Sequence, residues 1–458
     1  MLLYWLSISC GASVLAGRNL DGNDLVRTLL RLPFYYGWVV LGMFVVAGSM
    51  AAASSQPFMA VMLKPITEEF GWSRTEATTA ISVGTIGTGF VSPFVGRLAD
   101  RYGSRLLVPV GGLLLAVAFF LIAGVNALWQ FYLAYILARS IASPCLSGVG
   151  AQTAMINWFS TKRGRAVGLI VMTFPLANSL QAPVAQWLTG EIGWREVFVV
   201  LGVATALIVI VPGYLVLRNR PEDLGLYPDG ASGPPESGRG GGRRMPAGAR
   251  ARDYDFTLKQ AMRTRVLWLI VLASFLSILG GGAVSFHQVA YYQDLGLTPT
   301  IAAASISTFT LAGAFSSGLW GFLSEKVSER LLASGLTLAG AFVVLAMLEV
   351  RTDVMALVVS GVFGLTTRGG GTLFSLLLAS YYGRGNFGSI SGFFQTFSSF
   401  GLGIGPFVGA IIFDVTDGYR LLFVLLSVTY TATALILLFL VREPPLPEDV
   451  EGNAAVMA

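Results

Sequence analysis

Twelve apolar segments of about membrane-spanning length dominate this sequence. A helix that crosses a bilayer needs about 20 mainly apolar residues, and only helices and closed barrels satisfy every backbone polar group in lipid. The segments lie near residues 37–62, 75–98, 106–125, 128–157, 166–188, 195–217, 266–292, 299–323, 331–349, 354–381, 387–413 and 420–441. The sequence therefore predicts an all-α membrane protein with twelve transmembrane helices.

The composition excludes several classes of protein. The chain is 54% hydrophobic and 12% charged, against roughly 25% charged in ordinary soluble proteins, so a soluble enzyme is excluded. Two cysteines and one histidine exclude a disulfide framework and a multi-histidine metal site. Motifs such as HExxH, GxSxG or a P-loop are absent from the sequence, so we predict no enzyme activity, cofactor or metal. The net charge of +5 comes without a compact basic patch, and we predict no nucleic-acid partner.

The positions of lysine and arginine predict the orientation in the membrane. If both termini are cytoplasmic, most of the 30 basic residues fall on the inside, including the cluster Arg97, Arg101 and Arg105 and the arginines between the two sets of six segments. Cytoplasmic loops carry such an excess. We therefore expect a multi-pass protein of the cell inner (plasma) membrane with both termini in the cytoplasm.

A polar interval divides the chain into two halves. Residues 228–252 are rich in Gly, Pro and Arg and cannot bury enough apolar surface to fold, which is typical of a linker. We expect the following domains: a cytoplasmic extension at 1–34, a six-helix bundle at 35–217, a cytoplasmic linker at 218–263, a second six-helix bundle at 264–441 and a cytoplasmic tail at 442–458. We assign no function to the first 30 residues.

The two halves repeat each other at a constant shift of 225 residues. Three pairs of segments show the repeat: 71–82 with 296–307, 96–107 with 321–332, and 193–198 with 418–423. A parallel repeat of six helices implies two pseudo-symmetric bundles with a cavity between them near the middle of the membrane. Two such bundles that rock against each other form a transporter.

One of the repeated segments carries a family resemblance. The sequence Gly-Arg-Leu-Ala-Asp-Arg-Tyr-Gly-Ser-Arg at 96–105 closely resembles the signature loop of the major facilitator superfamily. The resemblance implies the twelve-helix major facilitator fold, with Gly96, Asp100, Arg101 and Arg105 as a conformational latch that stabilises the outward-facing state. Physically, Asp100 could pair with an arginine or meet a helix N-terminus.

Three shorter matches are similar to the monocarboxylate transporter and oxalate/formate antiporter branch of that superfamily. They are Gly-Trp-Val-Val at 37–40, Lys-Arg-x-x-Ala-x-Gly at 162–168 and Arg-Pro-Glu-Asp-x-Gly-Leu at 220–226. Monocarboxylate transporters typically place an Asp and an Arg in the eighth helix and a Lys within the first. This sequence departs from that pattern in both places, because the segment 301–323 carries no charge and the first segment has none before Lys64. Proton coupling would then fall to His287 or to Asp294.

Only three ionisable residues lie deep within the apolar segments: Arg139, Arg368 and His287. A charge at this depth costs at least about 2.5 kcal/mol and marks a functional or paired group. Arg368 corresponds through the repeat to Ser143, one helical turn from Arg139, so the two arginines could face one another across the cavity. No Asp or Glu lies at comparable depth. Since guanidinium binds carboxylate through two charge-assisted hydrogen bonds, the pair predicts an organic anion as substrate.

The predicted substrate-binding set also includes uncharged polar residues at helical spacing. Its members are Arg139, Arg368, His287, Asn178, Gln181, Gln395 and Tyr291. Two alternatives stay open: Arg139 could pair with backbone carbonyls as a scaffold residue, and His287 could be a hydrogen-bonded packing residue instead of a cavity or gate residue.

These observations predict a secondary active transporter that moves a small, monocarboxylate-like organic anion by alternating access. Its partners would be this anion, the lipid bilayer and, if coupling requires it, a proton; we expect a monomer. The alternative is an exporter of neutral or amphipathic compounds, which buried arginines within helix packing would favour. A membrane enzyme or sensor is a third, weaker alternative because catalytic motifs are missing. The sequence does not name the substrate or the direction of transport.

Overall fold

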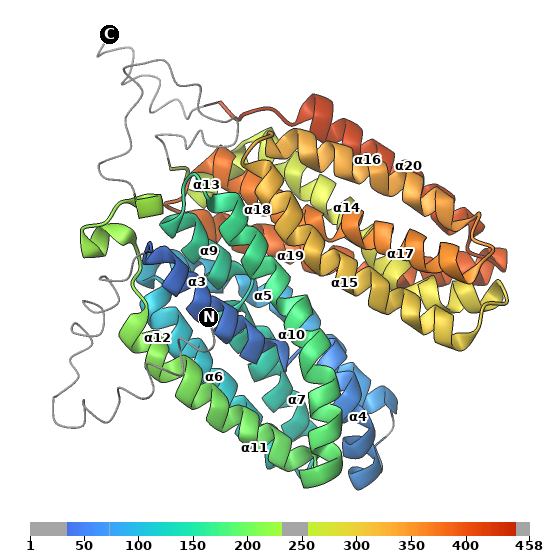
Figure 1. The fold of residues 1–458 in the computed structure, drawn as a ribbon, viewed down its shortest axis with the longest axis horizontal. Helices are drawn as coiled ribbons and strands as arrows, with labels where there is room; N and C mark the ends of the chain where they lie inside the picture. Colours follow the sequence, from blue (N-terminus) through green and yellow to red (C-terminus); the bar gives the residue numbers. More distant parts are fainter. Residues whose placement is uncertain (1–33, 73, 231–254, 446–458) are drawn as a thin grey trace.

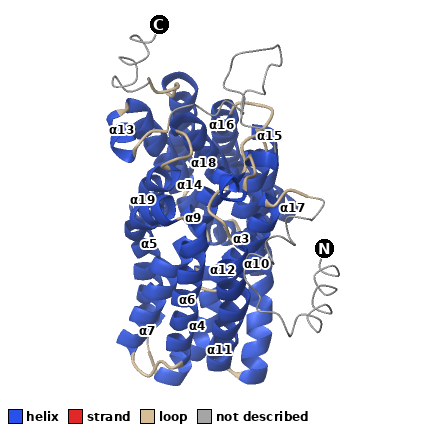
Figure 2. Cartoon of the chain, turned by 90° about the vertical axis from the view of Figure 1, so that its left-hand side faces the viewer, coloured by secondary structure: helices blue, strands red, loops and turns tan. Residues whose placement is uncertain are grey.

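The computed structural model describes residues 34–72, 74–230 and 255–445, and every regular element within these ranges is helical (Figures 1 and 2). The first 33 residues, the middle of the expected linker and the end of the expected tail lie outside the described residues. The predictions for those segments therefore stay predictions.

The first half of the chain forms six helical rods, of which three are interrupted. Their elements are α3 (Gly37–Ala52), α4 (Gln56–Phe70), α5 (Arg74–Tyr102), α6 (Ser104–Ala123), α7 (Leu128–Ile136), η2 (Leu137–Ala142), α8 (Ser143–Leu146), α9 (Val149–Trp158), α10 (Arg163–Ile192), α11 (Trp194–Thr205), η3 (Ala206–Ile210) and α12 (Val211–Val216). Short 3-10 turns η4 (Pro221–Leu224) and η5 (Pro228–Gly230) follow.

The second half repeats this arrangement. Its elements are α13 (Leu258–Arg263), α14 (Arg265–Asp294), α15 (Pro299–Ser324), α16 (Glu329–Met347), α17 (Asp353–Thr367), α18 (Gly369–Tyr382), α19 (Phe387–Thr416), α20 (Arg420–Leu435) and η6 (Ile436–Leu440). Apart from the short α13, these elements make six rods, since α17 with α18 and α20 with η6 are continuous along the chain.

The prediction of twelve transmembrane helices in two six-helix bundles is confirmed. Eleven helical rods among the described residues are long and apolar enough to cross a membrane, and the shorter apolar helix α3 begins the twelfth. The first predicted segment ended at residue 62, whereas the structure breaks at residues 53–55 and continues to Phe70. The break has a local cause, because Pro57 near the start of α4 has no N–H to continue the α3 hydrogen-bond ladder.

Large apolar side chains remain exposed along the outer sides of the bundles. Trp129, Trp187 and Phe342 are each more than 60% exposed. A soluble protein would bury such side chains, whereas lipid solvates them. The outer surfaces are therefore suited to the hydrocarbon of a bilayer.

The two bundles meet near one end of the molecule and diverge toward the other (Figure 1). We call the end that carries η4, η5 and α13 the linker face, and the opposite end the far face. The bundles pack against each other mainly through α5 with α19 and α10 with α15. Glycine permits this contact, because a Cβ on Gly96 would lie 2.0 Å from the carbonyl oxygen of Gly388, and one on Gly164 would lie 2.0 Å from that of Gly321.

Candidate functional site

Arg139 lies where the fourth rod departs from α-helical geometry. The segment η2, Leu137–Ala142, is a π-helical turn between α7 and α8, a feature that occurs frequently at functional sites. The hydroxyl of Thr88 on α5 donates to the carbonyl oxygen of Arg139 at 3.1 Å. A second departure follows at Gly148, which has a φ of +57°. The local geometry thus fixes the backbone of Arg139 against α5.

The Arg139 guanidinium has no charged partner among the residues that the structure describes. Nη1 donates to the Ser143 hydroxyl at 3.3 Å, and the guanidinium carbon lies 5.7 Å from the ring centre of Phe174 on α10. The Nε atom is buried and has no hydrogen-bond partner among the described residues. An unsatisfied donor on a charged group is costly in a protein interior. A ligand that supplies an acceptor would remove that cost.

Arg368 lies at the junction of α17 and α18, in the equivalent rod of the other bundle. Its stem packs on Gly313 of α15, where an added Cβ would lie 2.5 Å from Arg368 Cγ. The guanidinium carbon lies 5.0 Å from the ring centre of Phe309. The side chain is exposed and makes no hydrogen bond or ion pair within the described ranges. Arg368 is therefore open to an external acceptor.

Each arginine packs on a helix of its own bundle, and these two helices contact each other. Arg139 packs on α10 and Arg368 packs on α15, and these two helices contact each other at Met172 and Gly318. Phe174 lies two residues from Met172, about 3 Å along the helix axis, and Gly313 lies five residues from Gly318, about 7.5 Å. The Arg368 guanidinium lies farther along α15, over Phe309, which is nine residues, about 13.5 Å, from Gly318. Each arginine thus contacts one of the two helices that form a main contact between the bundles.

Asn178 and Gln181 lie on α10 beyond Phe174 and hold the break between α3 and α4. Asn178 Oδ1 accepts a hydrogen bond from the hydroxyl of Ser55 in that break. Gln181 Nε2 donates to the carbonyl oxygen of Ser49 at 2.7 Å, while its Oε1 is buried without a partner in the described part of the chain. Both amides therefore connect the Arg139 region to the first rod, and Gln181 retains one free acceptor.

His287 and Tyr291 contact neighbouring helices of their own bundle. His287 Nε2 lies 2.9 Å from the carbonyl oxygen of Pro406, and Nδ1 lies 3.3 Å from the hydroxyl of Tyr419. Tyr291 donates its hydroxyl to the carbonyl oxygen of Met347 at 2.9 Å. This geometry matches the alternative in which His287 is a hydrogen-bonded packing residue, and it places Tyr291 in the same layer of α14.

Two side-chain hydrogen bonds join the bundles near the arginines. The Ser375 hydroxyl on α18 donates to Gln152 Oε1 on α9 at 2.8 Å, and Ser375 lies seven residues, about 10 Å, from Arg368 toward the linker face. The Thr396 hydroxyl on α19 donates to the carbonyl oxygen of Gly89 on α5 at 2.8 Å. The adjacent Gln395 is half-buried. The contact of Ser375 with Gln152 lies on the linker side of Arg368. The contact of Thr396 with Gly89 lies at the level of Arg139, because the adjacent Thr88 donates to the Arg139 carbonyl oxygen.

Asp100, at the end of α5, lies against the N-terminus of α19 in the other bundle. Its Oδ1 accepts the N–H of Gly388 at 2.8 Å, and its Oδ2 accepts the N–H and the hydroxyl of Ser389, each at 2.6 Å. The N-terminus of a helix carries partial positive charge and free N–H groups, so it stabilises a carboxylate. The loop segment with the family signature therefore joins the two bundles at the linker face.

Arg101 and Arg105 do not take part in this contact. The Arg101 guanidinium lies over the ring of Tyr102 at 5.3 Å, and that of Arg105 lies over the ring of Tyr214 at 5.6 Å. Both lie at the linker face, where basic side chains favour an anionic membrane surface. Their position in this structure is that of surface anchors.

Glu325 is the counterpart of Asp100 in the repeat and was missed by the sequence analysis. It lies 225 residues after Asp100 and contacts the N-terminus of α10. Its Oε1 accepts the N–H of Arg165 at 3.1 Å, and its Oε2 pairs with Arg165 Nε at 2.8 Å. A further pair, Arg384 with Glu222 at 2.8 Å, joins the bundles nearby. The repeat carried the signal for Glu325, because 96–107 aligns with 321–332.

Comparison with known proteins agrees with this architecture. The sequence model of the Major Facilitator Superfamily matches residues 39–291 and 270–456. In the solved structures, the transporter FucP in its outward conformation superimposes with a TM-score of 0.67 and 13% sequence identity, covering 88% of this chain and 99% of FucP.

Named relatives include carriers of carboxylates. The probable L-galactonate transporter of Escherichia coli (strain K12) is 26% identical over 83% of this chain and 84% of its own. Monocarboxylate transporter 4 of Mus musculus is 25% identical over 88% and 83%, and the oxalate:formate antiporter of Oxalobacter formigenes is 22% identical over 58% and 58%. Together with the two helical bundles and the signature loop, these matches establish that the chain belongs to the major facilitator superfamily of membrane transporters.

Proposed function

We propose that the chain is a secondary active transporter of a small, monocarboxylate-like organic anion that works by alternating access. The observation that carries the proposal is the pair Arg139 and Arg368, one in each bundle, neither of which has an acidic partner among the described residues. The names of the relatives support a carboxylate, since they include transporters of galactonate, oxalate, formate and monocarboxylates.

The geometry of each arginine suits an anionic ligand. A phenyl ring lies near each guanidinium, and a carboxylate can accept two parallel hydrogen bonds from the N–H groups of a guanidinium. A hydrogen bond to a charged group contributes about 1.5–3 kcal/mol. Asn178, Gln181 and Gln395 provide the uncharged polar lining, and His287 with Tyr291 holds the far end of α14 in place.

Alternating access follows from the contacts at the linker face. We place this face in the cytoplasm because the basic residues gather there, with both termini on the same side. The bundles are then closed toward the cytoplasm and diverge toward the outside. Asp100 and Glu325, each on a helix N-terminus of the opposite bundle, form a symmetric latch that must open before the substrate leaves on the cytoplasmic side.

The exporter alternative would be favoured if the guanidiniums lay within helix packing. Arg368 is exposed, and an unpaired cation attracts an anion, repels a cation and has little net interaction with a neutral compound. The organic-anion proposal therefore accounts better for the geometry.

Uptake into proteoliposomes tests the proposal. The purified full-length chain would be assayed with labelled lactate, formate, oxalate and galactonate, and with lactamide as the uncharged analogue of lactate. We expect saturable uptake of at least one carboxylate, none of lactamide above protein-free liposomes, and a response to an imposed proton gradient if a proton is coupled. Equal uptake of lactate and lactamide would contradict an anion-specific site.

A further inference from the structure

The repeat places one arginine at the first turn of the last rod of each bundle, at the far face. These are Arg195 in Gly-Trp-Arg and Arg420 in Gly-Tyr-Arg. Arg195 is fully engaged: its guanidinium pairs with Glu69 at 2.8 Å, donates to the carbonyl oxygen of Val125 at 2.9 Å, and lies over the ring of Trp194 at 4.5 Å. In the first bundle, therefore, the protein itself neutralises this charge.

Arg420 has no such partners. Its side chain is exposed and forms no hydrogen bond or ion pair in the part of the chain that the structure describes. The counterpart of Glu69 is Asp294, which is exposed and does not pair with Arg420. The duplication has thus kept both the arginine and a carboxylate, but the two are not paired in the second bundle.

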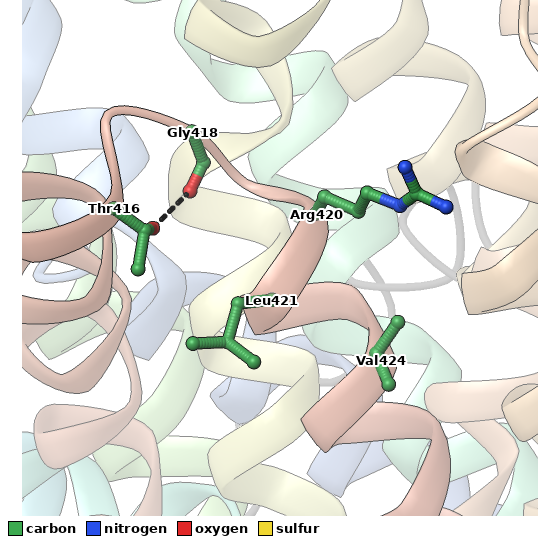
Figure 3. A pocket seen from close by; sticks show the side chains of 5 residues that line it. All are labelled: Thr416, Gly418, Arg420, Leu421 and Val424. Atoms are coloured by element: carbon green, nitrogen blue, oxygen red, sulfur yellow. Dashed lines mark hydrogen bonds between the residues drawn. The ribbon is translucent and has the colours of Figure 1, made fainter.

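A shallow hollow lies beside Arg420 (Figure 3). It has a volume of about 350 Å³ and is lined by Thr416, Gly418, Arg420, Leu421 and Val424. The Thr416 hydroxyl is already bound to the carbonyl oxygen of Gly418 at 3.0 Å. Apart from Arg420, the hollow therefore offers mainly apolar surface to a ligand.

The apolar side of the hollow faces the bilayer. Leu421, Val424 and Val428 recur at helical spacing on α20 and are 44%, 40% and 62% exposed. The opposite side of α20 packs on α14 and α16 of its own bundle, so the exposed stripe lies on the periphery and away from the contact between the bundles. The hollow therefore begins at the membrane surface, at Arg420, and continues into the hydrocarbon.

We propose that this hollow binds the headgroup of an anionic phospholipid, with the phosphate on Arg420 and the first carbons of an acyl chain on Leu421 and Val424. The charge of Arg420 matches the phosphate, and the apolar stripe matches the acyl chain. Arg420 also lies at the level of the membrane surface, where a phospholipid headgroup lies. The N-terminus of α20 adds partial positive charge at the same level. The site is separate from the substrate cavity and does not depend on the proposed transport activity.

Native mass spectrometry of the detergent-purified full chain tests this site. Phosphatidylglycerol and phosphatidylcholine would be titrated separately against the wild type, Arg420→Gln and, as a matched control, Arg351→Gln, which removes another exposed arginine of the far face. We expect Arg420→Gln to weaken the tightest phosphatidylglycerol binding about fivefold, the effect of one basic residue near a membrane surface. Arg351→Gln should leave it unchanged, and phosphatidylcholine binding should not respond to either variant.

Two further measurements separate a lipid site from surface charge and from a soluble anion. Val424→Trp fills the hollow and keeps Arg420, so it should weaken phosphatidylglycerol binding, whereas Arg420→Lys should retain most of it. Three results would each overturn the proposal. The first is an equal loss of binding in Arg420→Gln and Arg351→Gln, and the second is full binding by Val424→Trp. The third is displacement of the lipid by glycerol phosphate at the same concentration. Size-exclusion elution of each variant at the wild-type volume checks that it has folded.

Discussion

Phe174 and Phe309 determine how the two cavity arginines can be used. Each ring lies within 5.7 Å of a guanidinium carbon, and each belongs to a helix other than that of its arginine. A cation over an aromatic face is stabilised by about 0.5–2 kcal/mol, depending on desolvation. The rings therefore orient the guanidiniums without neutralising them, which leaves the full charge for a ligand.

Replacing one ring tests this orientation. We expect Phe309→Leu to raise the KM for the transported anion about fivefold, since a loss of about 1 kcal/mol in positioning corresponds to that ratio. The maximal rate should change much less, and uptake kinetics in proteoliposomes would separate the two. Phe342→Leu, which alters a ring that is 65% exposed to the bilayer, is the control. An unchanged KM in Phe309→Leu would show that the ring does not position Arg368.

The two arginines could be predicted as site residues from the sequence. The prediction needed only their position deep within apolar segments and the absence of acidic residues at the same depth. It could not assign the partners of His287, because one of them is the backbone carbonyl of Pro406 and the other is Tyr419, 132 residues away. The spacing of residues in the sequence does not reveal a backbone acceptor on another helix. Glu325, in contrast, was within reach, because the repeat aligns it with Asp100.

At the scale of elements, hydropathy located the rods but not their interruptions. The predicted segments agree with the observed helices, yet the break at residues 53–55 and the π-helical turn η2 change no average hydropathy. Pro57 was a visible signal for the break. The π-helical turn has no comparable signal, because it depends on how the fourth rod packs on α5.

The glycine contact between α10 and α15 should control which conformation the transporter prefers. An added Cβ on Gly164 would lie 2.0 Å from the carbonyl oxygen of Gly321, whereas one on Gly190 of the same helix meets no atom within 4 Å. We expect Gly164→Ala to push the bundles apart at the linker face and to raise the inward-facing population. Spin-label distances across that face would measure it.

Gly190→Ala is the matched control for this experiment and should keep the wild-type distances. If Gly164→Ala also keeps them, α10 and α15 do not need to approach closely in the closed state, and the role of this contact in alternating access would have to be abandoned.

At the scale of the whole molecule, two equivalent carboxylates close the linker face. Asp100 accepts from Gly388 and Ser389, and Glu325 accepts from Arg165. A carboxylate at a helix N-terminus contributes about 0.3–1 kcal/mol, and up to about 2 kcal/mol when partly buried. Because the contacts are separate, their effects on the conformational equilibrium should add.

Neutral variants test this symmetry. We expect Asp100→Asn and Glu325→Gln each to increase the inward-facing population several-fold, which about 1 kcal/mol produces, and the double variant to show the product of the two effects. The readout is the labelling rate of a single introduced cysteine at the linker face, in a background that lacks the native thiols. An effect of Asp100→Asn alone would show that the latch is one-sided.

The central claim is that the guanidiniums of Arg139 and Arg368 receive the carboxylate of the substrate, and saturable uptake by charge-neutral variants measures it most directly. We predict that Arg139→Gln and Arg368→Gln each lower kcat/KM at least tenfold, the loss expected for about 1.5–3 kcal/mol of charged hydrogen bonding, while Arg351→Gln at the far face transports normally. Wild-type kcat/KM in Arg368→Gln, with the variant correctly folded, would contradict the account.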